Sequence, residues 1–167
     1  MSRRQPSTPG WSPEKKLWDE LEYLGEDLSW KKVELDQNRA HLVSKNDRGV
    51  YLICASPPVK TIDAINAYTI LYAGQVKSRN RSLQNRFLEH IRRPSPQLKL
   101  FLDCYYPAVH FWFAIVQDPS KIDALETLLI ETFNPPCNDI RAPGTQVLLA
   151  GIGVGRIIGT GRKHRTT

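Results

Sequence analysis

The fold is decided by residues 70–93, ILYAGQVKSRNRSLQNRFLEHIRR. The pattern predicts a short strand, a turn at Gly74, a basic loop and a helix that ends before a proline. At about 100° per residue, Arg86 and His90 fall along the border of the helix's apolar stripe. That stripe consists of Leu83, Phe87 and Ile91. Groups at such a border are half buried, where pKa values can be shifted. The alternative is a solvated basic helix with one edge histidine.

The composition indicates a globular protein with an anionic partner. The chain has 167 residues, of which 41% are hydrophobic and 24% are charged. These values predict one domain with room for a core. The net charge of +6 and the pI of about 9.3 favour an anionic partner, with nucleic acid as the first candidate.

The three cysteines, Cys54, Cys104 and Cys137, are odd in number and far apart. No pair of them has the spacing of a zinc finger, which indicates a reducing, cytoplasmic setting. No apolar run resembles a signal peptide or is long enough for a membrane span, so we expect no membrane partner.

We expect one domain with three parts. Residues 1–45 hold an arm and an outer helix that begins near Ser12, residues 46–141 form the core, and residues 142–167 are a glycine-rich basic segment. Residues 29–48 fit more than one period, and we assign no element there. The pattern GIGVG in the last part lacks the lysine-serine pair of a phosphate loop, so we do not interpret it as one.

Three stretches predict strands: residues 49–55, 70–73 and 109–116. In the first, GVYLICA, alternation places Tyr51 and Ile53 on one face of the strand and the other apolar side chains on the opposite face. A second short helix is expected near residues 97–103, and a longer one opens at Asp118-Pro119-Ser120, where the N-cap residue and the proline suit a helix start.

Glu126 lies on this longer helix. In projection it falls inside the apolar face of the helix, whereas Glu131 falls on the solvated side. A carboxylate among apolar side chains is costly unless it is paired or binds a metal. Two explanations therefore stand, an ion pair with a core-edge arginine such as Arg86 or a role as a metal ligand, and we favour the second.

A proline-rich turn follows the helix and ends at Asn138, a residue type that is common in turns. Basic side chains near the predicted site are candidates for contacts with nucleic-acid phosphates. They are Lys77, Arg79, Arg81 and Arg93 around the helix, and Arg162, Lys163 and Arg165 in the tail.

Together these segments resemble the GIY-YIG nuclease family over about residues 49–139. Gly49-Val50-Tyr51 is similar to the first family motif and Tyr72-Ala73-Gly74 to the second, with two isoleucines replaced. The family places an arginine on the next helix, often followed by a histidine. It places a metal-binding glutamate on a later helix, before a proline-rich turn and an asparagine. The corresponding residues here are Arg86, His90, Glu126 and Asn138.

The resemblance implies an α/β (α+β) fold with a three-stranded antiparallel sheet flanked by helices, here with an N-terminal helical extension and a basic C-terminal tail. It implies metal-dependent hydrolysis of phosphodiester bonds in double-stranded DNA. The cofactor would be Mg²⁺ (or Mn²⁺), held by Glu126. The Arg-x-x-x-His spacing is closest to the restriction-endonuclease-like branch, for which a homodimer would suit two-fold DNA sites.

The resemblance also implies a role for each residue. Tyr51 would orient or deprotonate the attacking water, helped by Arg86, His90 or the metal, because its unperturbed pKa is near 10. Tyr72 would hold the phosphate or the water, and Arg86 would stabilise the charge of the transition state. Asn138 would hold the geometry of the site through hydrogen bonds.

Gln75 departs from the family pattern, because several relatives carry a lysine there; that role is either absent or passed to Lys77. One alternative is a catalytically silent, basic nucleic-acid-binding protein with the same fold, and another is a repair or mobile-element nuclease. A silent relative would be expected to have lost a catalytic residue. The intact set of Tyr51, Tyr72, Arg86 and Glu126 therefore favours an enzyme.

Overall fold

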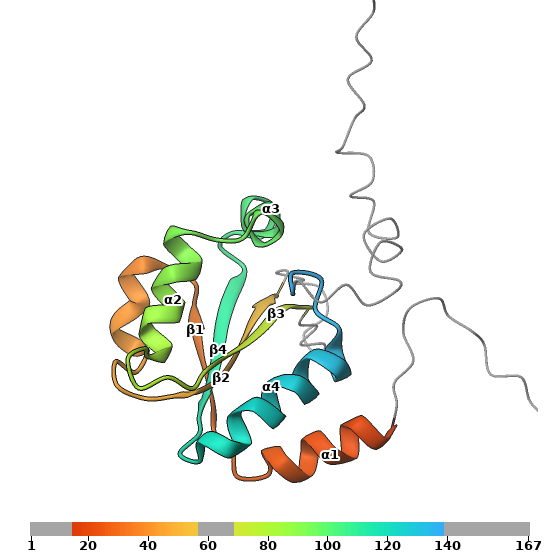
Figure 1. Ribbon diagram of the computed structural model, residues 1–167. Helices are drawn as coiled ribbons and strands as arrows, with labels where there is room; N and C mark the ends of the chain where they lie inside the picture. Colours follow the sequence, from red (N-terminus) through yellow and green to blue (C-terminus); the bar gives the residue numbers. More distant parts are fainter. Residues whose placement is uncertain (1–14, 57–68, 139–167) are drawn as a thin grey trace, which may run out of the picture. The chain divides into compact units, whose positions relative to one another are not determined.

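Four strands form one antiparallel sheet in the computed structural model of the chain, which describes residues 15–56 and 69–138 (Figure 1). Their order across the sheet is β1-β4-β2-β3. The strands are β1 Trp30–Glu34, β2 Gly49–Ala55, β3 Thr69–Val76 and β4 Val109–Ile115. The predicted mixture of helices with an antiparallel sheet is therefore confirmed.

β2 is the central strand for packing, because every one of its residues is buried. It pairs with β4 on one side and with β3 on the other. The predicted alternation is confirmed: Val50, Leu52 and Cys54 belong to the core cluster of one sheet face. Tyr51 points to the opposite face, where its ring stacks on Phe111 at a centroid distance of 4.9 Å.

One face of the sheet is covered by α4 Pro119–Phe133, and α1 Lys15–Gly25 lies alongside α4 (Figure 1). The start of α4 follows from its sequence, since the Asp118 side chain accepts a hydrogen bond from the Ser120 amide and proline fits the first turn. Ile122, Leu125 and Leu129 bury the inner side of the helix. This packing fixes which side of α4 turns toward the edge strand β3.

α2 Leu83–Arg92 packs on the other face, where Phe87 meets Phe111 edge to face at 5.3 Å. Its N-cap is Ser82, whose side chain accepts from the Asn85 amide. The helix ends before Arg93-Pro94, as predicted. The short helix expected near residues 97–103 is α3 Pro96–Tyr105.

Two sequence predictions need correction. The sheet has four strands and not three, because β1 lies in the stretch that we left unassigned. β1 buries only Val33 of its five residues, and a 3₁₀ helix, η1 Gln37–Leu42, follows it, so this stretch carries little apolar periodicity. The turn predicted at Gly74 is also wrong. β3 runs through this position, where Gly74 pairs with Tyr51 of β2.

All described residues lie within one compact unit, Pro13–Asp139. The predicted arm at residues 1–10, the helix start at Ser12 and the basic segment 142–167 lie outside the described residues. Among the helices that the structure describes, none has both the length and the apolar content to cross a membrane.

Gly49 should be the glycine of the sheet that tolerates substitution least. Its φ is +155°, and a Cβ added there would collide with the backbone carbonyl of Ala114. Because backbone cannot move aside cheaply, Gly49→Ala is expected to lower the free energy of unfolding by about 3 kcal/mol. Gly25→Ala is the control, since its Cβ would meet only Leu28 Cδ1 at 3.8 Å. Urea unfolding checks both variants, and equal stabilities would contradict the expectation.

Candidate active site

A cavity of about 390 Å³ opens where the end of β3, the start of α2 and the inner side of α4 meet. Its wall includes Tyr51, Tyr72, Arg86 and Glu126, which come from β2, β3, α2 and α4. The structure therefore brings together four of the predicted catalytic side chains from separate elements.

Tyr51 is buried, and its hydroxyl lies 3.0 Å from Nε2 of His90. Its ring stacks on Tyr72 at 6.0 Å, and Tyr72 in turn lies 5.0 Å from the His90 ring. Burial raises the pKa of Tyr51 well above its usual value, and the neighbouring Tyr72 raises it further. The phenol is therefore neutral at physiological pH, and its hydroxyl can donate to His90 while its oxygen accepts from another group.

Gly74 allows this arrangement, because a Cβ at this position would lie 2.5 Å from the Tyr51 hydroxyl oxygen and 2.8 Å from Cε1 of Tyr72. The pairing of β2 with β3 also contains a β-bulge just beyond Tyr72. Ile53 pairs with Tyr72 but Cys54 pairs with Ile70, so β3 carries one extra residue. Between Tyr51 and the bulge the register is regular, and Tyr72 pairs with Ile53. Tyr72 therefore lies on the same face of the sheet as Tyr51.

His90 lies on α2, next to Tyr51 and outside the cavity wall. Burial lowers the pKa of His90 to about 4, and the positive charge of Arg86 acts in the same direction. The imidazole is therefore neutral at pH 7, and a neutral imidazole has one nitrogen that can accept a proton. Its hydrogen bond to Tyr51 makes the two side chains a connected pair.

Arg86 lines the cavity with a half-buried side chain and donates to Glu89 Oε2 at 2.7 Å. Its Nε is buried and has no hydrogen-bond partner among the described residues. An unpaired buried N–H is costly, so an anion that enters the cavity would gain from it. The predicted position at the border of the apolar stripe is confirmed.

Glu126 is half buried, and burial raises the pKa of its carboxyl, an effect that hydrogen bonding to Gln75 and the charge of Arg86 offset in part. It makes no ion pair with any residue that the structure describes, and Arg86 pairs with Glu89 instead. The ion-pair explanation for Glu126 therefore finds no support.

The oxygen atoms around Glu126 suit a hard divalent cation. The Gln75 side chain lines the same cavity, and its Oε1 is buried without a hydrogen-bond partner in the described part of the chain. Mg²⁺ prefers oxygen ligands and is often held by one or two carboxylates while it keeps several waters. Residues 15–56 and 69–138 contain no cluster of three or more His, Cys, Asp or Glu that could enclose a metal. A divalent ion held by Glu126 and Gln75 would keep most of its waters.

Asn138 lies outside the cavity wall and clamps the edge strand. Its Oδ1 accepts from the Ala73 amide at 2.9 Å, and its Nδ2 donates to the Ala73 carbonyl at 2.8 Å. The Cys137 amide adds a bond to the Leu71 carbonyl at 2.9 Å. The chain after α4 thus pairs with the open edge of β3 on either side of Tyr72.

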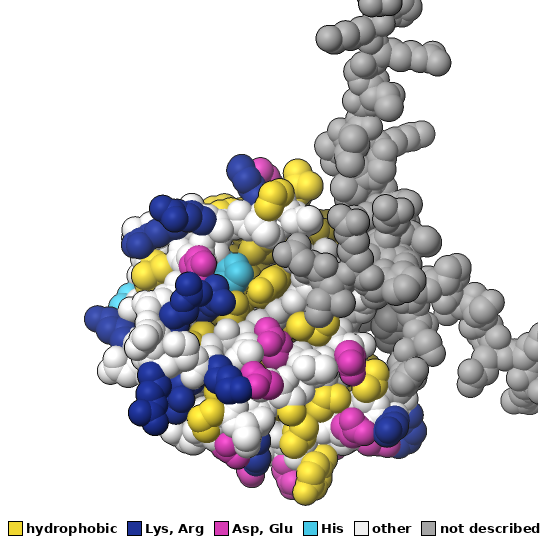
Figure 2. Space-filling view, viewed as in Figure 1, with side chains coloured by type: hydrophobic (Ala, Val, Ile, Leu, Met, Phe, Trp, Pro, Cys, Tyr) yellow, Lys and Arg dark blue, Asp and Glu magenta, His cyan; other side chains and the backbone are white. Residues whose placement is uncertain are grey.

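Of the predicted phosphate-binding residues, Lys77 and Arg81 are in the cavity wall, and Arg79 and Arg93 are exposed outside it. Arg162, Lys163 and Arg165 lie outside the described residues. Figure 2 shows a group of Lys and Arg side chains over α2 and the loop before it, with carboxylates toward α4; further basic side chains lie over α1 and α3.

Three polar residues at the site were not predicted to function there: Gln75, Glu89 and Asp123. Gln75 Nε2 donates to Asp123 Oδ1 at 2.9 Å, and Lys77 Nζ donates to Asp123 Oδ2. Asp123 precedes Glu126 by three residues, which places both carboxylates on one side of a helix. That spacing was the signal in the sequence that could have identified Asp123.

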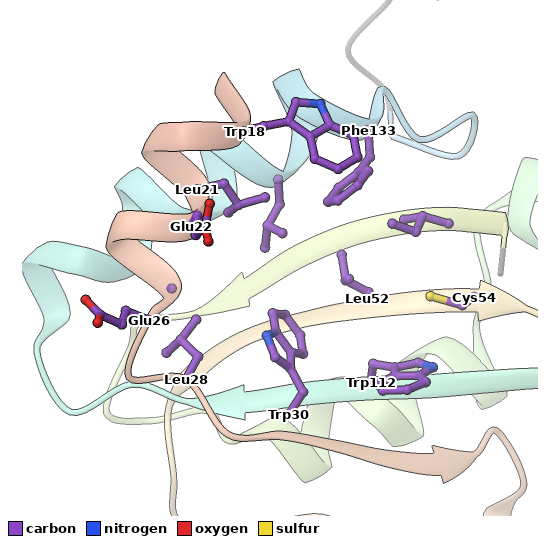
Figure 3. Close-up of a pocket in the computed structure, with 13 residues that line it drawn as sticks. Trp18, Leu21, Glu22, Glu26, Leu28, Trp30, Leu52, Cys54, Trp112 and Phe133 are labelled. Carbon is purple, nitrogen blue, oxygen red and sulfur yellow. The ribbon is translucent and has the colours of Figure 1, made fainter. Parts of the chain in front are cut away.

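A second cavity of about 570 Å³ lies on the α4 face of the sheet, between α1 and the strands (Figure 3). Its wall is aromatic and aliphatic, with Trp18, Trp30, Trp112 and Phe133 among the lining side chains. It also includes two carboxylates, Glu22 on α1 and Glu26 in the turn that follows α1. None of the described residues that line it is a lysine or arginine, so the described wall does not suit a phosphate.

Comparison of the chain with protein-family models, with curated proteins and with solved structures returns no match. The interpretation of the site therefore depends on its own geometry and chemistry.

Acid should destabilise the protein through His90. Its folded pKa of about 4 lies below the unfolded value of about 6.5, so the unfolded state binds more protons between these pH values. Stability is therefore intact above about pH 6.5 and falls as the pH decreases toward about 4, by up to about 3 kcal/mol.

His90→Gln should flatten this part of the stability profile, because the Gln amide keeps a partner for the Tyr51 hydroxyl but does not titrate. Urea unfolding across the pH range checks this expectation. Carboxylates with a lowered pKa, such as Glu89, destabilise both proteins when they are protonated at low pH. The difference between the two stability profiles therefore reports on His90. Identical profiles would show that the pKa of His90 is the same in the folded and unfolded protein.

Proposed function

We propose that this chain is a metal-dependent endonuclease that hydrolyses phosphodiester bonds in double-stranded DNA. The observation that carries the proposal is the convergence of Tyr51, Tyr72, Arg86 and Glu126 on one cavity, with His90 bonded to Tyr51. The arrangement offers a proton acceptor, a charge stabiliser and a carboxylate within one polar cavity. These are the groups that phosphodiester hydrolysis needs.

The resemblance to the GIY-YIG nucleases supports the same reaction, since each of these side chains occupies a motif position of that family. The Arg-x-x-x-His spacing of Arg86 and His90 favours a restriction-type enzyme. Repair and mobile-element nucleases use the same chemistry, and the length and sharpness of the DNA products would separate these classes.

Tyr51 and His90 form a relay for the proton of the attacking water. With Nε2 of the neutral imidazole as acceptor, the Tyr51 hydroxyl donates to it and its oxygen accepts a hydrogen bond from the water. As the water attacks phosphorus, Tyr51 takes its proton and passes its own to His90. The raised pKa of Tyr51 requires this transfer, because a free phenolate is not populated at pH 7.

Arg86 stabilises the charge that develops on the phosphoryl oxygens, and its buried Nε has no hydrogen-bond partner among the described residues. Tyr72 lies in the cavity wall beside Tyr51 and would position the phosphate or the water. Lys77 and Arg81 add two cations to the cavity wall and would contact phosphates of the DNA backbone.

Glu126, with the free oxygen of Gln75, would hold one divalent ion. When bound, Mg²⁺ or Mn²⁺ supplies positive charge for the leaving oxygen. The carboxylate is needed in its ionised form, so the raised pKa of Glu126 predicts that acid weakens metal binding earlier than for an ordinary glutamate.

Incubation of the protein with supercoiled plasmid and Mg²⁺ tests the proposal, with EDTA as the control. Nicked and linear products that require the metal are the expected result, and discrete fragments would indicate sequence specificity. Salt-sensitive binding to DNA with no cleavage in Mg²⁺ or Mn²⁺ would overturn the enzyme and favour the silent binding protein.

Glu126→Gln should abolish cleavage with little effect on stability or DNA binding. The substitution keeps the side-chain volume and removes the charge that the metal requires. Glu131→Gln on the exposed side of the same helix is the matched control and should cleave at the wild-type rate. Cleavage rates and thermal unfolding are measured for both; cleavage by Glu126→Gln near the wild-type rate would remove the carboxylate from the mechanism.

Tyr51→Phe should lower the single-turnover cleavage rate by about 10²-fold or more, the usual scale of proton-transfer assistance. Stability should fall by only about 1 kcal/mol, because one buried hydrogen bond to His90 is lost while the ring still packs. Tyr23→Phe, at a side chain that is 79% exposed, is the control. A wild-type rate for Tyr51→Phe would mean that the tyrosine has a packing role alone.

A further inference from the structure

Each cation in the wall of the candidate active site is paired with a carboxylate that is not part of that wall. The three cations are Lys77, Arg81 and Arg86. Lys77 pairs with Asp123, and both arginines pair with Glu89. The proposed function uses the cations and assigns no role to either carboxylate.

Asp123 projects from α4 one helical turn before Glu126, on the β3 side of the cavity. One of its oxygens accepts from Gln75 Nε2 at 2.9 Å, and the other accepts from the Lys77 ammonium. Gln75 lies near the end of β3 and Lys77 directly follows that strand, and both side chains reach Asp123. Both carboxylate oxygens of Asp123 are therefore hydrogen-bonded to side chains of the cavity wall, one to Gln75 and one to Lys77.

Glu89 plays the corresponding part on the α2 side. Its Oε2 lies 2.7 Å from Nη1 of Arg86 and 3.9 Å from Nη1 of Arg81. One carboxylate oxygen thus engages both guanidinium groups. The cavity is flanked on two sides by anions that neutralise its cationic wall.

A carboxylate and a phosphate offer ammonium and guanidinium groups the same kind of acceptor. The Lys77–Asp123 pair is easy to exchange, because its side chains are 46% and 52% exposed. In the Arg86–Glu89 pair, Arg86 is 30% exposed and Glu89 is 46% exposed. Exposed ion pairs contribute little to stability and are screened by salt. An incoming phosphate can therefore displace the carboxylate at small cost.

We propose that Asp123 and Glu89 are positioning residues that compete with DNA phosphates for Lys77, Arg81 and Arg86 and so set the threshold for DNA binding. This inference rests on the proposed function. In the free protein the carboxylates hold the cations beside the cavity. Only a DNA strand that reaches several of them at once displaces both carboxylates, which disfavours weak, non-specific binding.

Binding of a short synthetic duplex, measured by fluorescence anisotropy in EDTA so that no cleavage occurs, tests the role of Asp123. Asp123→Asn should lower the Kd by about fivefold, since it removes a competitor worth one exposed ion pair. Asp103→Asn is the matched control: it makes the same change of charge in an exposed pair, with Lys99 at 3.1 Å on α3, outside the cavity wall. The control should change the Kd by less than about twofold.

A second pair of variants separates competition for Lys77 from a general effect of charge. In a Lys77→Gln background, Asp123→Asn should change the Kd by less than about twofold, because no cation remains to be released. A gain that persists without Lys77 would show that Asp123 acts only through its field and would overturn the proposal. Unchanged or weaker binding by Asp123→Asn with Lys77 present would overturn it as well.

Glu89→Gln should also bind the duplex more tightly, and the combination with Asp123→Asn should gain roughly the product of the two effects. Weaker binding by Glu89→Gln would show that Glu89 orients Arg86 for phosphate, which contradicts competition. If the wild-type protein cleaves plasmid but the variants bind the duplex with the wild-type Kd, this inference is wrong and the proposed function stands. A wild-type protein that neither binds the duplex nor cleaves plasmid defeats the proposed function and the inference together.

Discussion

The pairing of β2 with β3 under the Tyr51 ring is the constraint on which the site depends. Tyr51 lies over Gly74, and no larger residue fits beneath its hydroxyl. The same hydroxyl reaches His90 on α2, so one side chain connects the central strand, the edge strand and a helix on that face of the sheet. The regular register from Tyr51 to Ile53 then places Tyr72 on the same face as Tyr51. A change in this register would turn the tyrosines away from the cavity.

The electrostatics of the cavity follow from unequal burial. Burial raises the pKa of Tyr51 and lowers the pKa of His90, so both side chains are neutral at pH 7. Glu126 is half buried and keeps a carboxylate that a cation would stabilise. Lys77 and Asp123 are exposed, and their charges remain available to solvent and to ligands. The buried groups are thus neutral, and the exposed groups are charged.

Much of the fold was readable because its elements have strong local patterns. The buried strand at Gly49–Ala55, the N-cap of α4 at Asp118 and the end of α2 before Arg93-Pro94 were predicted from residue type and spacing. β1 was missed because an edge strand that buries one residue has almost no alternation. Gly74 was misassigned to a turn, because glycine is required there by the packing of a ring from another strand, which no local pattern records.

The sequence by itself determined the catalytic candidates: helical phase placed Arg86 and His90 at an apolar border and Glu126 on an inward side, because side-chain direction follows directly from residue number in a helix. Tertiary structure alone decided the partners. The bond from Tyr51 to His90 spans 39 positions, the clamp of Asn138 on Ala73 spans 65, and the ion pair of Lys77 with Asp123 spans 46. Such contacts depend on how α2 and α4 pack against the sheet, and local periodicity carries no information about that packing.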